Sequence, residues 1–191
     1  MTHTAIRLSG FGLMAGAALL GAAIVMLSFQ PVMDQIFSPG VSLLLLLASI
    51  LLLLSLPSMY AKQSEAVGWL GLVGHTLLQS GLILVVVIGA APFVYPSLRD
   101  APGESLVAFG LGISLTLCLL LTGIATLRAG VYPRWSGILL LATPAGFFFD
   151  FFIAEFLPPI AGQVGSAAFG VLLALALGWM GCSNLLARRS E

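Results

Sequence analysis

Four polar residues within long apolar stretches are the strongest candidates for chemistry in this sequence. Asp150 stands in the aromatic run FFFDFFIAEF at residues 147–156, and Thr143 falls on the same face of a helix as Asp150. His75 and Gln79 lie one helical turn apart in another apolar stretch, so a helix places them on one face. Histidine titrates near neutral pH, and a carboxylate within a membrane is a candidate for ion or proton transfer. These residues predict an intramembrane polar path, as a small secondary transporter or proton-linked permease would use.

A structural role accounts for the same residues without transport. Polar side chains that bond across helices fix the register of a membrane bundle, and each is worth about 0.6 kcal/mol. Asp150 follows Trp135 by 15 residues, which is roughly 22 Å along a helix and still within the hydrocarbon layer. Because a charge at mid-membrane costs about 2.5–3.5 kcal/mol, we expect Asp150 to face the bundle interior in either case.

The sequence lacks the residues that several other chemistries require. The apolar stretches contain no lysine for a Schiff base, and His3 lies in the terminal segment, which leaves His75 as the one histidine within the membrane. A haem or chlorophyll held by His75, alone or shared with another subunit, stays open as an alternative. Cys118 and Cys182 lack the spacing of a metal site, and no G-x-S-x-G or H-E-x-x-H motif occurs. We therefore expect no catalytic residues, no metal site and no enzyme activity.

The composition indicates that these residues lie within a membrane. Of 191 residues, 60% are hydrophobic and 7% are charged, whereas soluble domains have roughly 45–50% apolar and 25% charged residues. A crossing helix needs about 20 apolar residues. Six segments reach that length: 8–28, 41–60, 67–92, 105–127, 135–157 and 162–186. The sequence therefore predicts an all-α integral membrane bundle of six transmembrane helices that forms one domain over residues 1–191.

The distribution of Arg and Lys predicts the orientation of this bundle. With six crossings, one side collects six basic residues: Arg7, Lys62, Arg128, Arg134, Arg188 and Arg189. The other side has Arg99 alone. Since short loops rich in Arg and Lys stay in the cytoplasm, we expect both termini there. The balanced charge, with no cluster of basic residues, argues against nucleic acid as a partner.

The segment RAGVYPRWSG, residues 128–137, begins a predicted span on the cytoplasmic side. Pro133 suits the first turn of a helix, and charged and aromatic residues anchor a span at the headgroups. The predicted anchors are Arg128, Arg134, Trp135 and, shortly before Pro158 at the outer end, Glu155. The segment resembles a stretch of uncharacterised polytopic bacterial inner-membrane proteins, in which Pro-Arg-Trp opens a helix on the cytoplasmic side. The resemblance implies a multi-pass protein of the bacterial inner membrane and no particular activity.

Small residues recur every four positions along the last predicted span. They are Gly162, Ser166, Gly170, Ala174, Gly178 and Cys182, and we call this set the seam. A helix places the seam on one face, where small side chains allow close helix contact in lipid. The seam predicts packing within the bundle or, as the alternative, contact with a partner membrane subunit or a second copy. The leading functional expectation is a non-enzymatic accessory or scaffold subunit that binds partner protein or lipid through its helices.

The second predicted span, VSLLLLLASILLLLSLPSMY, is nearly all leucine. Ser42, Ser49 and Ser55 interrupt the leucines. A helix that is apolar on all sides is most stable where it faces lipid. We therefore expect this span at the periphery of the bundle.

Overall fold

The computed structural model describes residues 3–29, 38–94, 104–152 and 159–186 of the chain. These residues form five helices: α1 (His3–Ser28), α2 (Pro39–Val94), α3 (Glu104–Ala129), α4 (Arg134–Phe152) and α5 (Pro159–Leu186). No strand occurs in these four ranges, so the predicted all-α class is confirmed. Four helical segments are long and apolar enough to cross a membrane: Thr4–Ser28, Pro39–Val87, Gly112–Ala129 and Gly162–Leu186. They support the predicted membrane protein. The predicted span 135–157 runs past the end of α4 into residues outside the described ranges.

The helix α2 has 56 residues and bends at Gly68. Gly68 has φ 56° and ψ −140°, a conformation that glycine adopts and residues with a side chain rarely do. The predicted boundaries leave residues 61–66 between two spans, but the structure continues the helix through them, because Ala, Lys, Gln and Glu favour helix there. The reversal therefore falls at Gly68, between the halves 39–67 and 69–94.

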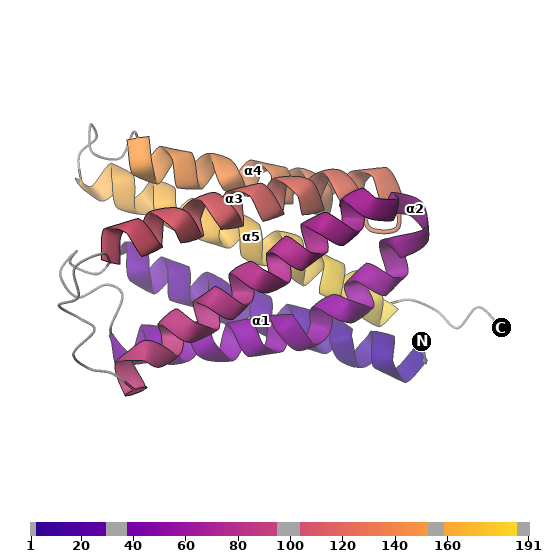
Figure 1. The fold of residues 1–191 in the computed structure, drawn as a ribbon, viewed down its shortest axis with the longest axis horizontal. Helices are drawn as coiled ribbons and strands as arrows, with labels where there is room; N and C mark the ends of the chain where they lie inside the picture. Colours follow the sequence, from indigo (N-terminus) through magenta and orange to yellow (C-terminus); the bar gives the residue numbers. More distant parts are fainter. Residues whose placement is uncertain (1–2, 30–37, 95–103, 153–158, 187–191) are drawn as a thin grey trace.

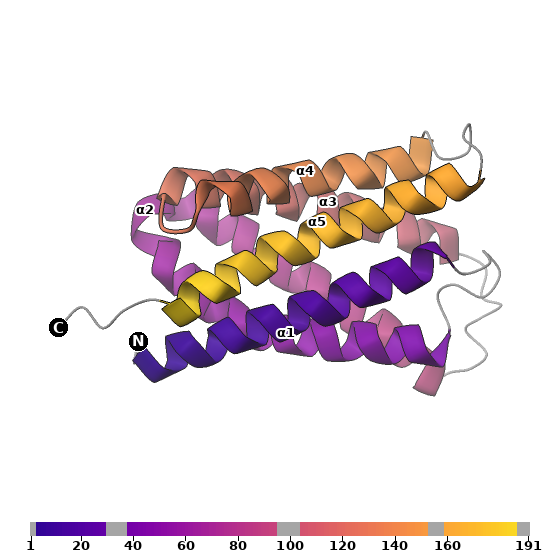
Figure 2. The same ribbon diagram turned by 180° about the vertical axis from the view of Figure 1, so that it is seen from behind.

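The helices form an elongated bundle in which each packs against its neighbours in the chain (Figure 1). The last helix, α5, also packs against α1, which closes a ring. At one end of the bundle α1 begins, α2 bends and α5 ends, and we call it the bend end (Figure 1 and Figure 2). The chain passes from α3 to α4 at the same end. The core between the helices is largely aliphatic and includes Leu13, Leu52, Leu140 and Met180.

The leucine-rich half of α2 has one inward face. Ser42, Ser49 and Ser55 are all buried, whereas Leu43 and Leu54 are exposed. The inward face packs on α1, where a Cβ atom added to a glycine would collide with α2. The serines of this half therefore face the bundle, and only some of its leucines face outward. The surface left for lipid is smaller than the helix, apolar on all sides, that the sequence predicts.

The contact between α1 and α5 depends on two glycines that face each other. A Cβ atom on Gly10 would lie 2.8 Å from the carbonyl oxygen of Gly181, and a Cβ atom on Gly181 would lie 2.7 Å from that of Gly10. Each site therefore excludes even a methyl group, because the obstructing atom belongs to a helix backbone that cannot rotate away. Such close approach gives the van der Waals contact that holds helices together in lipid.

We expect Gly181→Ala to destabilise the bundle by about 1–3 kcal/mol, because the added methyl group forces α5 away from α1. Gly178 is the matched control on the same helix, since a Cβ atom there meets nothing within 4 Å. Gly178→Ala should leave stability unchanged or raise it by up to about 1 kcal/mol. Equilibrium unfolding in detergent micelles measures both changes. Equal stability of the two variants would contradict the Gly10–Gly181 contact.

Candidate functional site

The structure places His75 and Gln79 on the second half of α2. His75 is buried, and its ring stacks on Tyr60 with the ring centroids 4.9 Å apart and the planes 24° apart. Tyr60 precedes the bend and His75 follows it, so this stack joins the two halves of α2. The Nδ1 atom of His75 is buried and has no hydrogen-bond partner among the described residues. Gln79, one turn further along, is half-buried.

The other two predicted path residues belong to α4. Thr143 is buried, and its hydroxyl donates to the carbonyl oxygen of Leu139 in the same helix, at 2.9 Å. Asp150 lies near the end of α4, and its side chain falls outside the described part of the structure. Within the described ranges α2 and α4 do not pack against each other, because α3 packs against both of them. The structure therefore does not bring His75 and Gln79 together with Thr143.

A fully apolar cavity of about 200 Å³ occupies the space between α1, α2, α3 and α5. The side chains that line it are all Leu, Ile or Val, including Leu20, Leu52, Leu78, Leu119 and Leu173. A cavity without polar groups stays dry, since water requires hydrogen-bond partners. The described interior of the bundle thus offers no hydrated route for an ion or a proton at this place.

The seam on α5 divides between two environments. A Cβ atom on Gly170 would collide with Ile24 of α1, and one on Gly21 would lie 2.8 Å from the Cβ atom of Ala174. These members of the seam therefore contact α1 within the chain. Gly178 instead faces open space. Gly162 is buried and accepts a hydrogen bond from the hydroxyl of Ser166 at 3.0 Å, and Cys182 is a half-buried free thiol.

Three of the four predicted interface anchors lie around the bend end. Arg128 and Arg134 are exposed, and Trp135 is 64% exposed. Trp69, directly after the bend, is 75% exposed. Exposed tryptophans at one level of a helical bundle are typical of the headgroup layer of a membrane. Glu155, the predicted anchor of the other end, lies outside the described residues.

Three distant residues meet at the bend end, and we call them the Lys62 cluster: Lys62, Tyr132 and Asn184. The Lys62 ammonium donates to Asn184 Oδ1 at 3.0 Å, and the Tyr132 hydroxyl donates to the same oxygen at 3.1 Å. The Lys62 nitrogen also lies 4.7 Å from the centroid of the Tyr132 ring, a cation–π contact. Beside the cluster, the Gln63 amide donates to the Thr126 hydroxyl at 3.4 Å. The cluster thus ties α2, the α3–α4 connection and α5 together.

Sequence reasoning missed the Lys62 cluster because its members are far apart in the chain. A usable signal was present, since Lys62 is the single lysine of the sequence. The predicted topology also places residues 62, 132 and 184 at one end of the bundle. Neither observation identifies the partner of Lys62, which depends on how the helices are arranged.

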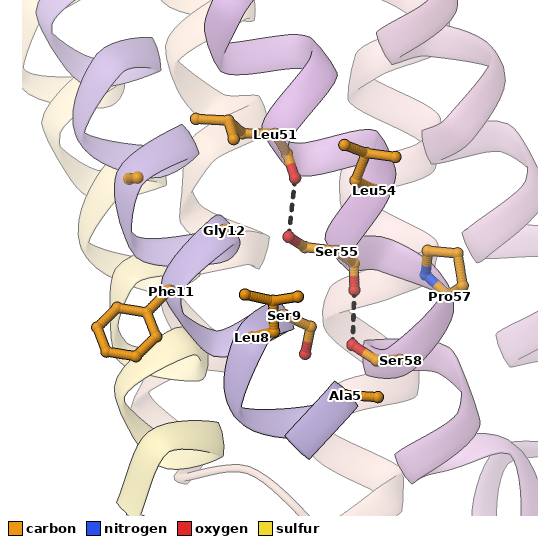
Figure 3. Close-up of a pocket in the computed structure, with 11 residues that line it drawn as sticks. Ala5, Leu8, Ser9, Phe11, Gly12, Leu51, Leu54, Ser55, Pro57 and Ser58 are labelled. Carbon is orange, nitrogen blue, oxygen red and sulfur yellow. Dashed lines mark hydrogen bonds between the residues drawn. The ribbon is translucent and has the colours of Figure 1, made fainter. Parts of the chain in front are cut away.

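An open groove of about 550 Å³ runs between α1 and the first half of α2 (Figure 3). Leu8, Phe11 and Leu54 flank the groove and are 60–75% exposed. Three buried serines, Ser9, Ser55 and Ser58, lie deeper. Their hydroxyls donate to carbonyl oxygens of their own helices at 2.7–2.8 Å, so they require no partner in the groove. The groove therefore suits an apolar occupant.

Comparison with known proteins yields no family assignment. No protein-family model, no curated protein and no solved structure matches this chain. Among the described residues, no group of three or more His, Cys, Asp or Glu side chains could hold a metal ion. The candidate sites for function are therefore the α1–α2 groove and the Lys62 cluster.

Burial raises the pKa of Tyr132 from 10.0 to about 12, against the opposing effect of its hydrogen bond to Asn184. The folded chain thus holds this proton more tightly than the unfolded chain, so the resulting stabilisation is complete below pH 10 and is lost as the pH rises toward 12. Tyr132→Phe keeps the ring beneath Lys62 but should cost about 1 kcal/mol at neutral pH.

We expect Tyr132→Phe also to lose less stability than the unmodified chain when the pH is raised from 7 to 11. Equilibrium unfolding in detergent at the two pH values measures this difference. An equal loss in both proteins would show that the Tyr132 proton does not stabilise the fold.

Proposed function

We propose that this chain is a non-enzymatic accessory or scaffold protein of the bacterial inner membrane that binds a membrane phospholipid through its helices. The observation that carries the proposal is the α1–α2 groove of about 550 Å³. Its volume falls within the roughly 300–1,000 Å³ of small-molecule sites. Its sides are large apolar side chains, and its serines are already bonded within their helices. An acyl chain meets these requirements without any polar contact.

A partner helix fits the groove less well than an acyl chain does. A helix about 10 Å wide that rises 1.5 Å per residue occupies roughly 120 Å³ per residue. The groove would therefore seat about five residues of a helix, little more than one turn. A partner that contacts the chain elsewhere would find its open surface near Gly178 rather than along the whole seam, since Gly170 already packs on α1.

The proposal includes six membrane crossings with both termini in the cytoplasm. Each half of α2 exceeds the roughly 20 residues that a crossing needs, and the bend at Gly68 returns the chain to its starting side. The positions of the helix ends support an even number of crossings, because α1 begins and α5 ends together at the bend end (Figure 1). The exposed Arg7, Arg128 and Arg134 favour the cytoplasm for that end.

The alternative function, a transporter that uses Asp150, His75 and Gln79, draws little support from the geometry. His75 and Gln79 lie on α2, and Asp150 lies on α4, which does not pack against α2 in the described ranges. The apolar cavity between α1, α2, α3 and α5 supplies no polar link. Unchanged flux in vesicles that carry Asp150→Asn would exclude a role for that carboxylate.

Single cysteines at the two ends of the first half of α2 test the six crossings. In a chain that carries Cys118→Ala and Cys182→Ala, a membrane-impermeant maleimide should label Gly40→Cys in intact spheroplasts. It should label Glu65→Cys, which is exposed beside the bend, only after lysis. Labelling of both sites from the same side would show that the first half of α2 does not cross. The reverse pattern would keep the crossings and overturn the orientation.

A bulky side chain in the groove tests lipid binding. Ala15 lines the groove and is exposed, so Ala15→Phe should fill part of the groove and lower the amount of phospholipid that remains bound. Ala18 is an exposed alanine of the same helix outside the groove lining, and Ala18→Phe is the matched control. Native mass spectrometry after gentle extraction counts the bound phospholipid. Equal amounts of bound phospholipid in the two variants would overturn the proposal. It would also be overturned if Ala15→Phe released a bound protein subunit and no lipid.

A further inference from the structure

The Lys62 cluster has more hydrogen-bond donors than acceptors. Both Lys62 and Tyr132 donate to the single oxygen Asn184 Oδ1. An ammonium group carries three N–H donors and a side-chain amide carries two. Asn184 is fully buried, and its Nδ2 atom has no hydrogen-bond partner among the described residues. Because a lysine can only donate, its bond to Asn184 fixes which end of the amide is the oxygen.

The unpaired donors belong to the same amide group that the Lys62 ammonium contacts. Nδ2 and Oδ1 of Asn184 are bonded to one carbon, and Lys62 donates to that Oδ1. No carboxylate of the described residues pairs with Lys62. A buried amide without a partner costs about 1–3 kcal/mol. A ligand with negatively charged oxygens would satisfy the amide and compensate the charge together.

The groove and the cluster are adjacent along α2. Leu51, Ser55 and Ser58 line the groove, and Lys62 follows Ser58 by one turn, so all four share one face of the helix. On α1, Asn184 lies against the face that meets α5, because a Cβ atom on Gly10 would lie 3.2 Å from the Cβ atom of Asn184. Lys62 therefore connects the groove side of α2 with the cluster, which lies beyond the groove at the bend end.

The depth of the cluster matches a phospholipid headgroup. Trp69 and Trp135 are exposed at the bend end, which is the level at which tryptophans meet the headgroup layer. Basic pockets between helices on the cytoplasmic side bind anionic headgroups in membrane proteins. From the surplus of donors, the uncompensated charge and the adjoining groove, we propose that the Lys62 cluster binds the phosphate of an anionic phospholipid whose acyl chain lies in the α1–α2 groove.

A purely structural clamp would not need this arrangement. An aspartate at position 184 would accept the same two hydrogen bonds, neutralise Lys62 and leave no unpaired donor. With asparagine at this position, the charge of Lys62 is not neutralised, and the two N–H groups of the amide have no partner among the described residues. Among the described residues, the cluster therefore lacks an acceptor for these N–H groups. The inference rests on the proposed lipid binding in the groove, and it adds the charge and headgroup chemistry of that lipid.

Native mass spectrometry of the full chain in detergent tests the preference for an anionic headgroup. The probes are phosphatidylglycerol and phosphatidylcholine with identical acyl chains, and inorganic phosphate alone. We expect phosphatidylglycerol to bind about fivefold more tightly than phosphatidylcholine, as one uncompensated lysine would give. Lys62→Gln and Asn184→Asp should both remove the preference. Arg128→Gln, which removes an exposed charge at the same end, should keep it.

The outcomes separate this inference from the proposed function. A preference that survives both Lys62→Gln and Asn184→Asp would overturn the site, as would an equal loss in Arg128→Gln. Equal binding of the two lipids, reduced by Ala15→Phe, would keep the groove and overturn the anionic headgroup. Binding of neither lipid would overturn the proposed function itself. Binding of inorganic phosphate without any lipid preference would overturn the lipid source.

The folding of the variants is controlled within the same experiment. Lys62→Arg keeps the charge and should retain the preference. Asn184→Asp keeps the shape of the side chain and the acceptor for Tyr132, so it should unfold at or above the temperature of the unmodified chain. A stable Asn184→Asp variant that still prefers phosphatidylglycerol would refute the role of the amide.

Discussion

The reversal of α2 at Gly68 is the constraint on which the remaining structure depends. A straight helix of 56 residues would extend about 84 Å, nearly three times the hydrocarbon thickness of a bilayer. Gly68 has no side chain and adopts φ 56° and ψ −140°, which allows the helix to fold back within a single residue. The fold-back places Tyr60 against His75, and through the packing of α3 on the second half of α2 it brings Tyr132 beside Lys62. The candidate phosphate site therefore exists because one glycine turns the chain.

The polar groups that form hydrogen bonds in the described bundle do so in two different ways. Ser55 and Thr143 donate to carbonyl oxygens one turn earlier in their own helices, so they can lie within the membrane without a tertiary partner. Lys62 and Asn184 cannot satisfy themselves in this way and bond across helices. Such groups are least costly near the headgroup layer, which is where the proposed topology places the bend end. The cluster that bonds across helices therefore lies at the end of the bundle, whereas buried hydroxyls such as those of Ser55 and Thr143 bond within their own helices.

The sequence was sufficient to predict the helical class, since apolar stretches of membrane length leave little choice of secondary structure. It did not predict where α2 turns, because residues 61–66 favour helix and Gly68 is one glycine among 22. The sequence also does not specify whether His75 and Thr143 come together. Helical periodicity places His75 and Thr143 on faces of their own helices, but it does not specify that α3 packs between α2 and α4. The Lys62 cluster depends on the same missing information.

Close packing and ligand binding need not be alternative uses of the small residues. A Cβ atom on Gly12 would lie 3.4 Å from the carbonyl oxygen of Leu51 and would collide with Ser55, so α1 and α2 touch almost backbone to backbone. Beside that contact, Phe11 and Leu54 project outward on either side. Narrow contact at the floor and large side chains at the rims together produce a groove. The glycine that holds the two helices together therefore also shapes the surface where a lipid chain would lie, so selection for stability and for binding would act on the same residue.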